Sequence, residues 1–329
     1  MEKVQFTDQS HLKLQLVPPD FSRDYGVLHT YTTGVIEHTV KYNLKITYVK
    51  TIINECRIFN IERISPVYVN DIEPDLIADQ LAYECGKVFY PLMLEIDFDG
   101  EFIGVHNYPE IIARWRKQKG IIQDYFTGEF TEKYLKLMEE AISTSELVTE
   151  IFRNELFYRV FFASVYKSYT STFKLEETSL FPIAGNAAPV KFHTVQEIDP
   201  ILNEAGKIQL IHQGHMTDDR SSRDLLEEQD FALSRFQYPD ELPASGSYTA
   251  LYRFDAETRS IFSIVAEWIL ETEPVQKNQV KVFELMKETE PVKEVKIDKS
   301  VDEGVFFIDG NHKKTEKRFS GIFNLLLGK

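Results

Sequence analysis

Alternating apolar and polar residues form the clearest pattern in the first part of the chain. Within residues 35–50, five apolar residues occupy alternate positions: Val40, Tyr42, Leu44, Ile46 and Tyr48. A period of two places these side chains on one face of an extended chain, so the segment predicts a long antiparallel strand whose other face meets water. Residues 56–69 predict a strand beside it, and Pro66 indicates an edge or a bulge there.

The pattern becomes helical after Pro109. Apolar residues then recur every three or four positions in three runs: residues 109–120, 131–142 and 145–169. This spacing predicts amphipathic helices. Gly120 is expected to end the first helix, and Ser145 is expected to cap the start of the last one.

Short apolar runs return after about Thr172. They are rich in aromatic and β-branched residues and are separated by turn residues: 189–195, 207–216, 247–255, 260–271, 279–287 and 304–310. Such runs predict strands. Strands, then helices, then strands is the order of an α+β protein, in which the N- and C-terminal strands form large antiparallel sheet and the central helices pack on one face.

The same order suggests a division of the chain into two parts. Residues 1–172 are expected to contain the N-terminal strands and the central helices. Residues 173–329 are expected to contain the C-terminal antiparallel strands. These strands either complete the same sheet or form a closely packed second half.

The segment "LEIDFDGEFIGVHN", residues 94–107, resembles the start of a calcium-binding loop. Glu95, Asp97, Asp99 and Gly100 occupy its first, third, fifth and sixth positions, but His106 stands at the twelfth, where a bidentate Glu is required. Its flanks are typical of strands. We therefore expect a β-hairpin with a type I′ turn at Asp99-Gly100, where both central residues take positive φ. Leu94, Ile96 and Phe98 then share one face, and the three carboxylates share the wet face.

Net charge excludes some classes of partner. The formal net charge is −15, which disfavours binding to nucleic acid or to anionic membranes. The densest basic cluster, His312 to Arg318, is expected to be a solvated loop. There is no apolar run of membrane-spanning length and no visible secretory signal, and two cysteines are too few for a disulfide framework. We expect no membrane insertion and a cytoplasmic protein with reduced thiols.

Metal binding has one candidate region in the sequence. His212, His215, Asp218 and Asp219 lie close together in the chain. However, residues three apart on a strand point to opposite faces, and no recognised ligand motif is present. We keep these four residues as weak metal candidates and expect no metal, no cofactor and no catalytic residue. The charged residues 217–230 around them are expected to be partly helical or mobile.

Three functions fit these observations, in order of preference. The first is a non-enzymatic protein-interaction module, such as an adaptor, chaperone or neutralising partner. Its binding partner is expected to be another protein, and the acidic charge of the chain would suit a basic one. The second is a binding protein for an apolar ligand in a cavity between sheet and helices. The third is an enzyme of unrecognised type that uses the region from His212 to Asp219.

Overall fold

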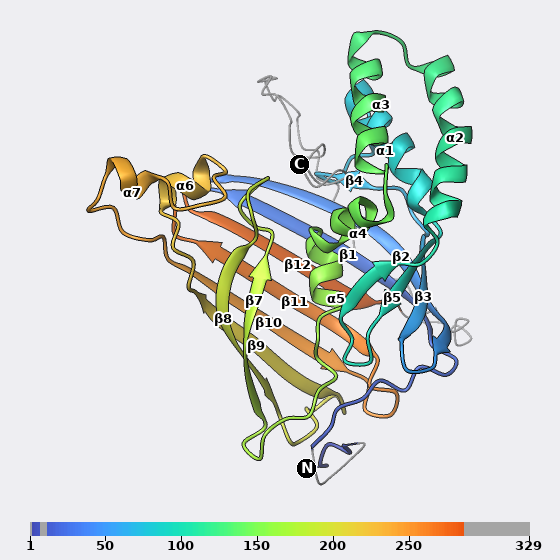
Figure 1. The fold of residues 1–329 in the computed structure, drawn as a ribbon. Coiled ribbons are helices and arrows are strands. Elements are labelled where there is room, and N and C mark those ends of the chain that lie inside the picture. Colours follow the sequence, from blue (N-terminus) through green and yellow to red (C-terminus); the bar gives the residue numbers. More distant parts are fainter. Residues whose placement is uncertain (1, 7–11, 286–329) are drawn as a thin grey trace, which may run out of the picture.

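The predicted α+β class is confirmed. The computed structural model describes residues 2–6 and 12–285, and it contains a 12-stranded antiparallel sheet with helices between its two sets of strands (Figure 1). The strands are β1 (Ser22–Thr33), β2 (Ile36–Ile52), β3 (Cys56–Arg63), β4 (Tyr68–Val69), β5 (Leu92–Ile96), β6 (Phe102–Val105), β7 (Lys174–Phe181), β8 (Val190–Ile198), β9 (Ile208–Met216), β10 (Gly246–Phe254), β11 (Ile261–Leu270) and β12 (Gln276–Glu284). The predicted strand at residues 304–310 and the basic cluster at 312–318 lie outside the described residues.

The described helices lie in three groups along the chain: before β5, between β6 and β7, and between β9 and β10. They are α1 (Ile77–Gly86), the 3-10 helix η1 (Lys87–Phe89), α2 (Tyr108–Tyr125), α3 (Glu129–Ala141), α4 (Ser145–Arg153), α5 (Leu156–Phe161), α6 (Ser222–Leu226) and α7 (Ser234–Gln237). In the described part of the chain, no helix is both long and apolar enough to cross a bilayer.

The sheet joins the two ends of the described chain. Its strand order is β6-β5-β3-β2-β1-β12-β11-β10-β9-β8-β7, and β4 pairs with β2. At the centre, Tyr25 of β1 lies opposite Glu284 of β12. Strands from both sides of residue 172 therefore share this sheet, while the division of the chain at that residue stays a prediction.

The alternating pattern of residues 35–50 produces β2. Val40, Leu44 and Ile46 are buried with exposed fractions of 5% or less, and Tyr42 and Tyr48 pack against the same core. Burying one large aliphatic side chain contributes roughly 1.5–3 kcal/mol, so the register of this strand is strongly specified.

The sheet curls around its helices. Figure 1 shows α4 and α5 lying against its concave side. Phe181 of β7 also contacts Trp268 of β11, with 5.3 Å between ring centroids, and Tyr248 of β10, at 4.4 Å. Among the described strands, β7 is an edge strand that pairs with β8. These contacts therefore show that the sheet bends strongly enough for its edge strand to reach distant strands. Aromatic rings fill this part of the interior.

Three helix boundaries differ from those expected. Helix α2 continues through Gly120 to Tyr125, because burial of Ile122 in the core offsets the roughly 1 kcal/mol helix penalty of glycine. Residues 145–169 do not form one helix, because the chain breaks between α4 and α5. There Glu155 is the N-cap of α5 and accepts a hydrogen bond from the Tyr158 backbone N–H. The N-cap of α4 is Thr144 rather than Ser145.

The hairpin at residues 94–107 is present as β5 and β6, but the predicted type I′ turn is wrong. Gly100 has φ +100°, Asp99 is not in the positive-φ region, and the Gly100 N–H donates to the Asp97 carbonyl at 3.1 Å. Asp99 is held instead by its own carboxylate, which accepts from the Glu101 N–H at 3.0 Å and from the Ser164 hydroxyl. Phe98 is 37% exposed and does not join the core.

Candidate functional site

The structure separates the two candidate histidines. His212 lies on β9 with 4% exposure, near the Tyr248 hydroxyl at 3.4 Å and the Glu177 carboxylate at 3.5 Å. Burial lowers the pKa of His212 to about 4, so its imidazole is neutral near pH 7. His215 lies on the opposite face, where its ring centroid is 5.4 Å from that of His193. His212 is therefore a core residue.

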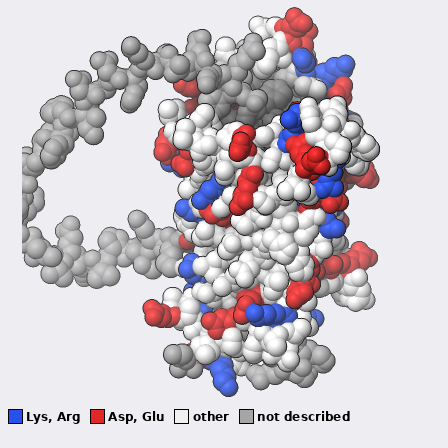
Figure 2. Space-filling model, turned by 90° about the vertical axis from the view of Figure 1, so that its left-hand side faces the viewer, with Lys and Arg blue, Asp and Glu red and all other residues white. Residues whose placement is uncertain are grey.

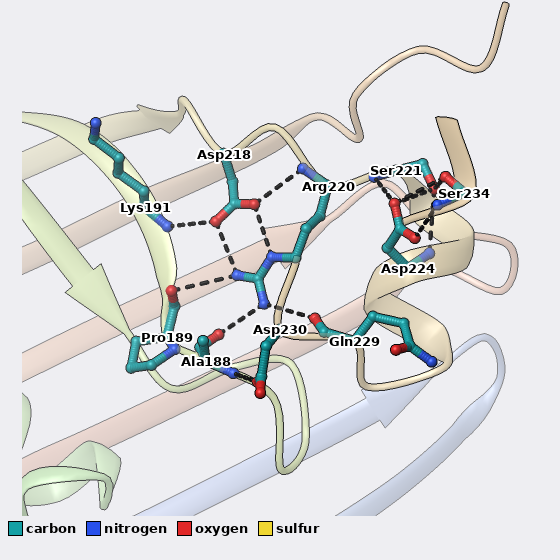
Figure 3. Close-up of polar contacts among 10 residues, drawn as sticks. All are labelled: Ala188, Pro189, Lys191, Asp218, Arg220, Ser221, Asp224, Gln229, Asp230 and Ser234. Carbon is teal, nitrogen blue, oxygen red and sulfur yellow. Dashed lines mark hydrogen bonds and ion pairs between the residues drawn. The ribbon is translucent and has the colours of Figure 1, made fainter. Parts of the chain in front are cut away.

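The two candidate aspartates also do not join the histidines. Asp219 is exposed, and both carboxylate oxygens of Asp218 are occupied by Arg220 (Figure 3). Within residues 2–6 and 12–285, no group of three or more His, Cys, Asp or Glu side chains is placed to hold a metal ion. Residues His212 to Asp219 thus connect a core strand to a surface loop.

Arg220 is the centre of a buried polar cluster at this loop. It is 3% exposed, and its Nε and Nη2 atoms each donate to Asp218 at 2.8 Å. Its Nη1 donates to the carbonyls of Ala188 at 2.8 Å and Gln229 at 3.1 Å, and Nη2 also donates to the Pro189 carbonyl at 3.3 Å. Figure 3 shows these groups converging on the guanidinium from three separate stretches of chain. The cluster is a clamp that ties these stretches together.

Asp218 completes the clamp on the acidic side. Burial opposes its ionisation, but hydrogen bonds from Arg220 and from the Lys191 backbone N–H, at 3.1 Å, lower its pKa below the usual range. The pair is therefore ionised and bidentate, which is the strongest geometry for a carboxylate and an arginine.

A second buried carboxylate fixes α6. Asp224 is 2% exposed and accepts from the N–H and hydroxyl of both Ser221 and Ser234, at 2.8–3.0 Å. Ser221 and Asp224 form a capping box at the start of α6. Burial opposes ionisation of Asp224, and these hydrogen bonds outweigh it and lower its pKa. The helix is thereby joined to the start of α7.

Between and beyond these anchors, the chain exposes a series of large apolar side chains. We call residues 226–242 the apolar loop. Its exposed apolar residues are Leu226 (39%), Phe231 (72%), Leu233 (45%), Phe236 (85%), Tyr238 (47%) and Leu242 (79%). Clusters of this kind on a protein surface mark interaction sites more often than single exposed apolar residues do.

The apolar loop lies at one end of the sheet, beside two hairpin turns. The Ser222 hydroxyl lies 3.5 Å from the Glu271 carbonyl, and the Gly34 N–H donates to the Val275 carbonyl at 2.9 Å. Val35 is fully exposed and Val275 is 48% exposed at these turns. Figure 2 views the side of the molecule that carries α7: charged side chains are interspersed with uncharged ones in its upper part, and a broader uncharged area lies below them at mid-height.

Charge on the connecting segment is predominantly negative. In residues 217–245, eight Asp and Glu residues stand against three Arg. Two of these Arg are engaged within the loop: Arg220 in the clamp, and Arg223 over the Tyr238 ring at 4.5 Å from its centroid. Residues 217–245 therefore carry a net negative charge, eight acidic residues against three basic ones.

Sequence reasoning missed this site for a definable reason. Residues 217–230 indicate a charged, solvated stretch, and the prediction of partial helix is met by α6. The burial of Arg220 depends on residues 188–189, which are far from it in the chain. The one available signal was five large apolar residues between Phe231 and Leu242 with no regular period.

Comparison with known proteins adds no assignment to these sites. No protein-family model matches the chain, and a search of curated proteins finds no match to its sequence.

Proposed function

We propose that this protein is a non-enzymatic interaction module that binds a basic, amphipathic segment of a partner protein through the apolar loop. One observation carries the proposal. Six apolar side chains of the apolar loop are exposed, while Arg220 and Asp224, which hold this part of the chain in place, are buried and hydrogen-bonded.

The rigid base is the first supporting argument. A loop with free ends would fold its apolar side chains onto the protein, because burying one contributes roughly 1.5–3 kcal/mol. Here the Arg220 clamp and the Asp224 caps fix the backbone on both sides of Phe231. Phe236 then stays 85% exposed. A partner that covers preordered apolar groups loses less conformational entropy on binding.

Charge is the second argument, and it selects the partner. The excess of carboxylates in residues 217–245 and the net charge of −15 attract a basic segment. The same charges oppose an anionic membrane and a second copy of this acidic chain.

The buried, unpaired thiols of Cys56 and Cys85 agree with a reducing compartment, so we place the interaction in the cytoplasm.

An enclosed apolar ligand has less support. The curled half of the sheet is filled by Phe181, Tyr248 and Trp268, whose rings contact one another at 4.4–5.3 Å. The space that such a ligand would occupy there is taken by side chains.

Variants of the apolar loop test the proposal. The double variant Phe236→Ser/Leu242→Ser removes two exposed groups and leaves the clamp intact. Ile53→Ser is the control, because Ile53 is 81% exposed in the turn between β2 and β3. The probe is a synthetic amphipathic helix of Leu and Lys, titrated by fluorescence anisotropy at two salt concentrations. A Leu/Glu peptide of the same pattern is the charge control.

We expect the double variant to bind the Leu/Lys peptide at least tenfold more weakly than the wild type, with Ile53→Ser unchanged. Binding should weaken as salt rises. Equal affinity of the double variant and the wild type would reject the apolar loop as the site. Tighter binding to phosphatidylserine vesicles than to the Leu/Lys peptide would replace the proposed partner with a membrane. Concentration-dependent dimers in sedimentation would replace it with a second copy of the chain.

A further inference from the structure

A small pocket lies between the sheet and the helices, away from the apolar loop. Its volume is about 70 Å³, and residues of β2, β3, α1, α4 and α5 line it. Six of its lining residues are aromatic: Tyr42, Tyr83, Phe89, Tyr90, Phe152 and Tyr158. We call it the tyrosine pocket.

Two carboxyl groups and one guanidinium also line this pocket. They are Glu155 at the start of α5, Asp79 on α1 and Arg63 at the end of β3. The Arg63 guanidinium lies over the Tyr90 ring, 4.5 Å from its centroid, so part of its charge already has a partner. Two carboxyl groups therefore face one partly engaged cation.

Glu155 has an unused hydrogen-bond acceptor. One carboxylate oxygen, Oε2, accepts from the Tyr158 N–H at 3.2 Å and caps α5. The other, Oε1, is shielded by the protein and has no hydrogen-bond partner in the described structure. A buried polar atom without a partner costs about 1–3 kcal/mol, so a ligand that donates to it gains affinity.

His29 lies close to Glu155 but does not neutralise it. His29 Nε2 lies 3.4 Å from Oε1, but this ring is fully buried and burial lowers its pKa to about 3. The neutral imidazole is engaged instead by tyrosine hydroxyls, with Tyr42 at 3.1 Å from Nε2 and Tyr31 at 3.3 Å from Nδ1. No ion pair forms between His29 and Glu155 at neutral pH.

We propose that the tyrosine pocket binds the ammonium head of a primary alkylamine. The ammonium pairs with the carboxyl group of Glu155, which lines the pocket, and the aromatic faces around it stabilise its positive charge. The volume admits roughly two water-sized groups, since a water molecule occupies about 30 Å³ of the liquid. That is enough for an ammonium and its first carbon.

The rest of such a ligand has a path out of the pocket. A groove of about 490 Å³ lies next to it between α1 and α2, and Pro74 and Tyr83 line both. Ile121 and Tyr125 line the groove and are 53% and 77% exposed. An apolar chain that leaves the tyrosine pocket would lie along these side chains.

Binding should depend on pH through Glu155. Burial raises the pKa of this carboxyl to about 7, and hydrogen bonds from backbone N–H groups and the charge of Arg63 lower it only in part. The other groups that face Glu155 do not change charge between pH 6 and 8: burial lowers the pKa of His29 and raises the pKa of Tyr31, Tyr42 and Tyr158. Asp79 also has a raised pKa, through burial and Asp75, and is tested separately.

The test uses n-hexylammonium as the probe, with n-hexanoate and n-hexanol as charge controls. Binding is followed by NMR of the full-length protein with labelled tyrosines. Glu155→Gln keeps the cap on α5 and removes the charge. Glu150→Gln on α4 is the matched control, because Glu150 is 49% exposed and pairs with Arg153. Asp79→Asn is a second pocket variant in case Glu155→Gln does not fold.

We expect hexylammonium to shift pocket tyrosine signals and to bind roughly tenfold more tightly at pH 8 than at pH 6, as ionisation of a carboxyl with a pKa near 7 requires. Glu155→Gln should weaken binding at least tenfold and remove the pH dependence, with Glu150→Gln unchanged. Tighter binding of Nα-acetyl-lysine methylamide than of hexylammonium would identify the ammonium as one carried by a protein side chain. Preference for hexanoate, equal binding of hexanol, or full affinity in both pocket variants would overturn the proposal.

Discussion

Replacing Arg220 by methionine tests whether the clamp holds the apolar loop in place. Methionine keeps much of the aliphatic volume but removes five hydrogen bonds from a side chain that is 3% exposed. Three backbone carbonyls and one carboxylate lose a donor. Breaking a buried ion pair from one side costs about 3–5 kcal/mol.

The lower end of that range applies here. Asp218 keeps two backbone donors, the N–H groups of Lys191 and Arg220, each at 3.1 Å. We therefore expect a loss of about 3 kcal/mol in the free energy of unfolding. In a protein of 329 residues, that corresponds to a fall of about 4–5 °C in melting temperature.

Urea unfolding followed by circular dichroism measures the loss, and hydrogen exchange locates it. The Lys191 amide, which donates to Asp218, and the Ser234 amide should lose protection before the amides of β10 do. Arg235→Met is the matched control, because Arg235 lies on α7 and is not fully buried. A loss for Arg220→Met within 1 kcal/mol of the control would refute the view that the clamp organises this loop.

Three further predictions concern other parts of the fold. Gly214→Ala should lower the free energy of unfolding by about 2 kcal/mol or more, because a Cβ there would clash with the β8 backbone. At Gly120 a Cβ meets nothing within 4 Å, so Gly120→Ala should stabilise α2 by about 0.5–1 kcal/mol. Thermal melts of both variants test these values. His29 must take up a proton on unfolding in acid, since its native pKa is about 3. Relative to His29→Gln, the wild type should thus lose about 1.4 kcal/mol per pH unit as pH falls from 6 to 4. Glu155 acts in the opposite direction: relative to Glu155→Gln, the wild type should lose up to about 3 kcal/mol as pH rises from 4.5 to 7, because its buried carboxyl must ionise. Urea titrations at a series of pH values measure both pH dependences. For either residue, a difference in unfolding free energy between wild type and variant that does not change with pH would contradict the shifted pKa.

Local pattern was sufficient for the fold class and for most of the strands, although β1 and β7 were not predicted. Alternation in β2 requires one buried face whatever the neighbours are, so Leu44 and Ile46 could be assigned to the core from sequence. The turn at Gly100 could not be typed in the same way. A Cβ on Gly100 would lie 2.8 Å from the Ala163 carbonyl oxygen, which is a contact with a distant part of the chain.

The candidate sites depend on such distant contacts still more. Arg220 stands in a run of charged residues, where its sequence neighbours favour solvent exposure. Glu155 stands within an apparently continuous helical run, and only the break between α4 and α5 turns it toward the tyrosine pocket. In both cases the partners that bury the side chain lie on elements far away in sequence.

The pairing of β1 with β12 has a consequence for the protein during its synthesis on the ribosome. Tyr25 must wait for the chain around Glu284 to be synthesised before this pair can form. At roughly 5–20 residues per second, about 250 residues take some 10–50 s to translate. During that interval β1 can pair with β2 on one side, while its other edge stays open to any strand nearby. A nascent chain of this protein is therefore a natural client for chaperones that cover unpaired strand edges.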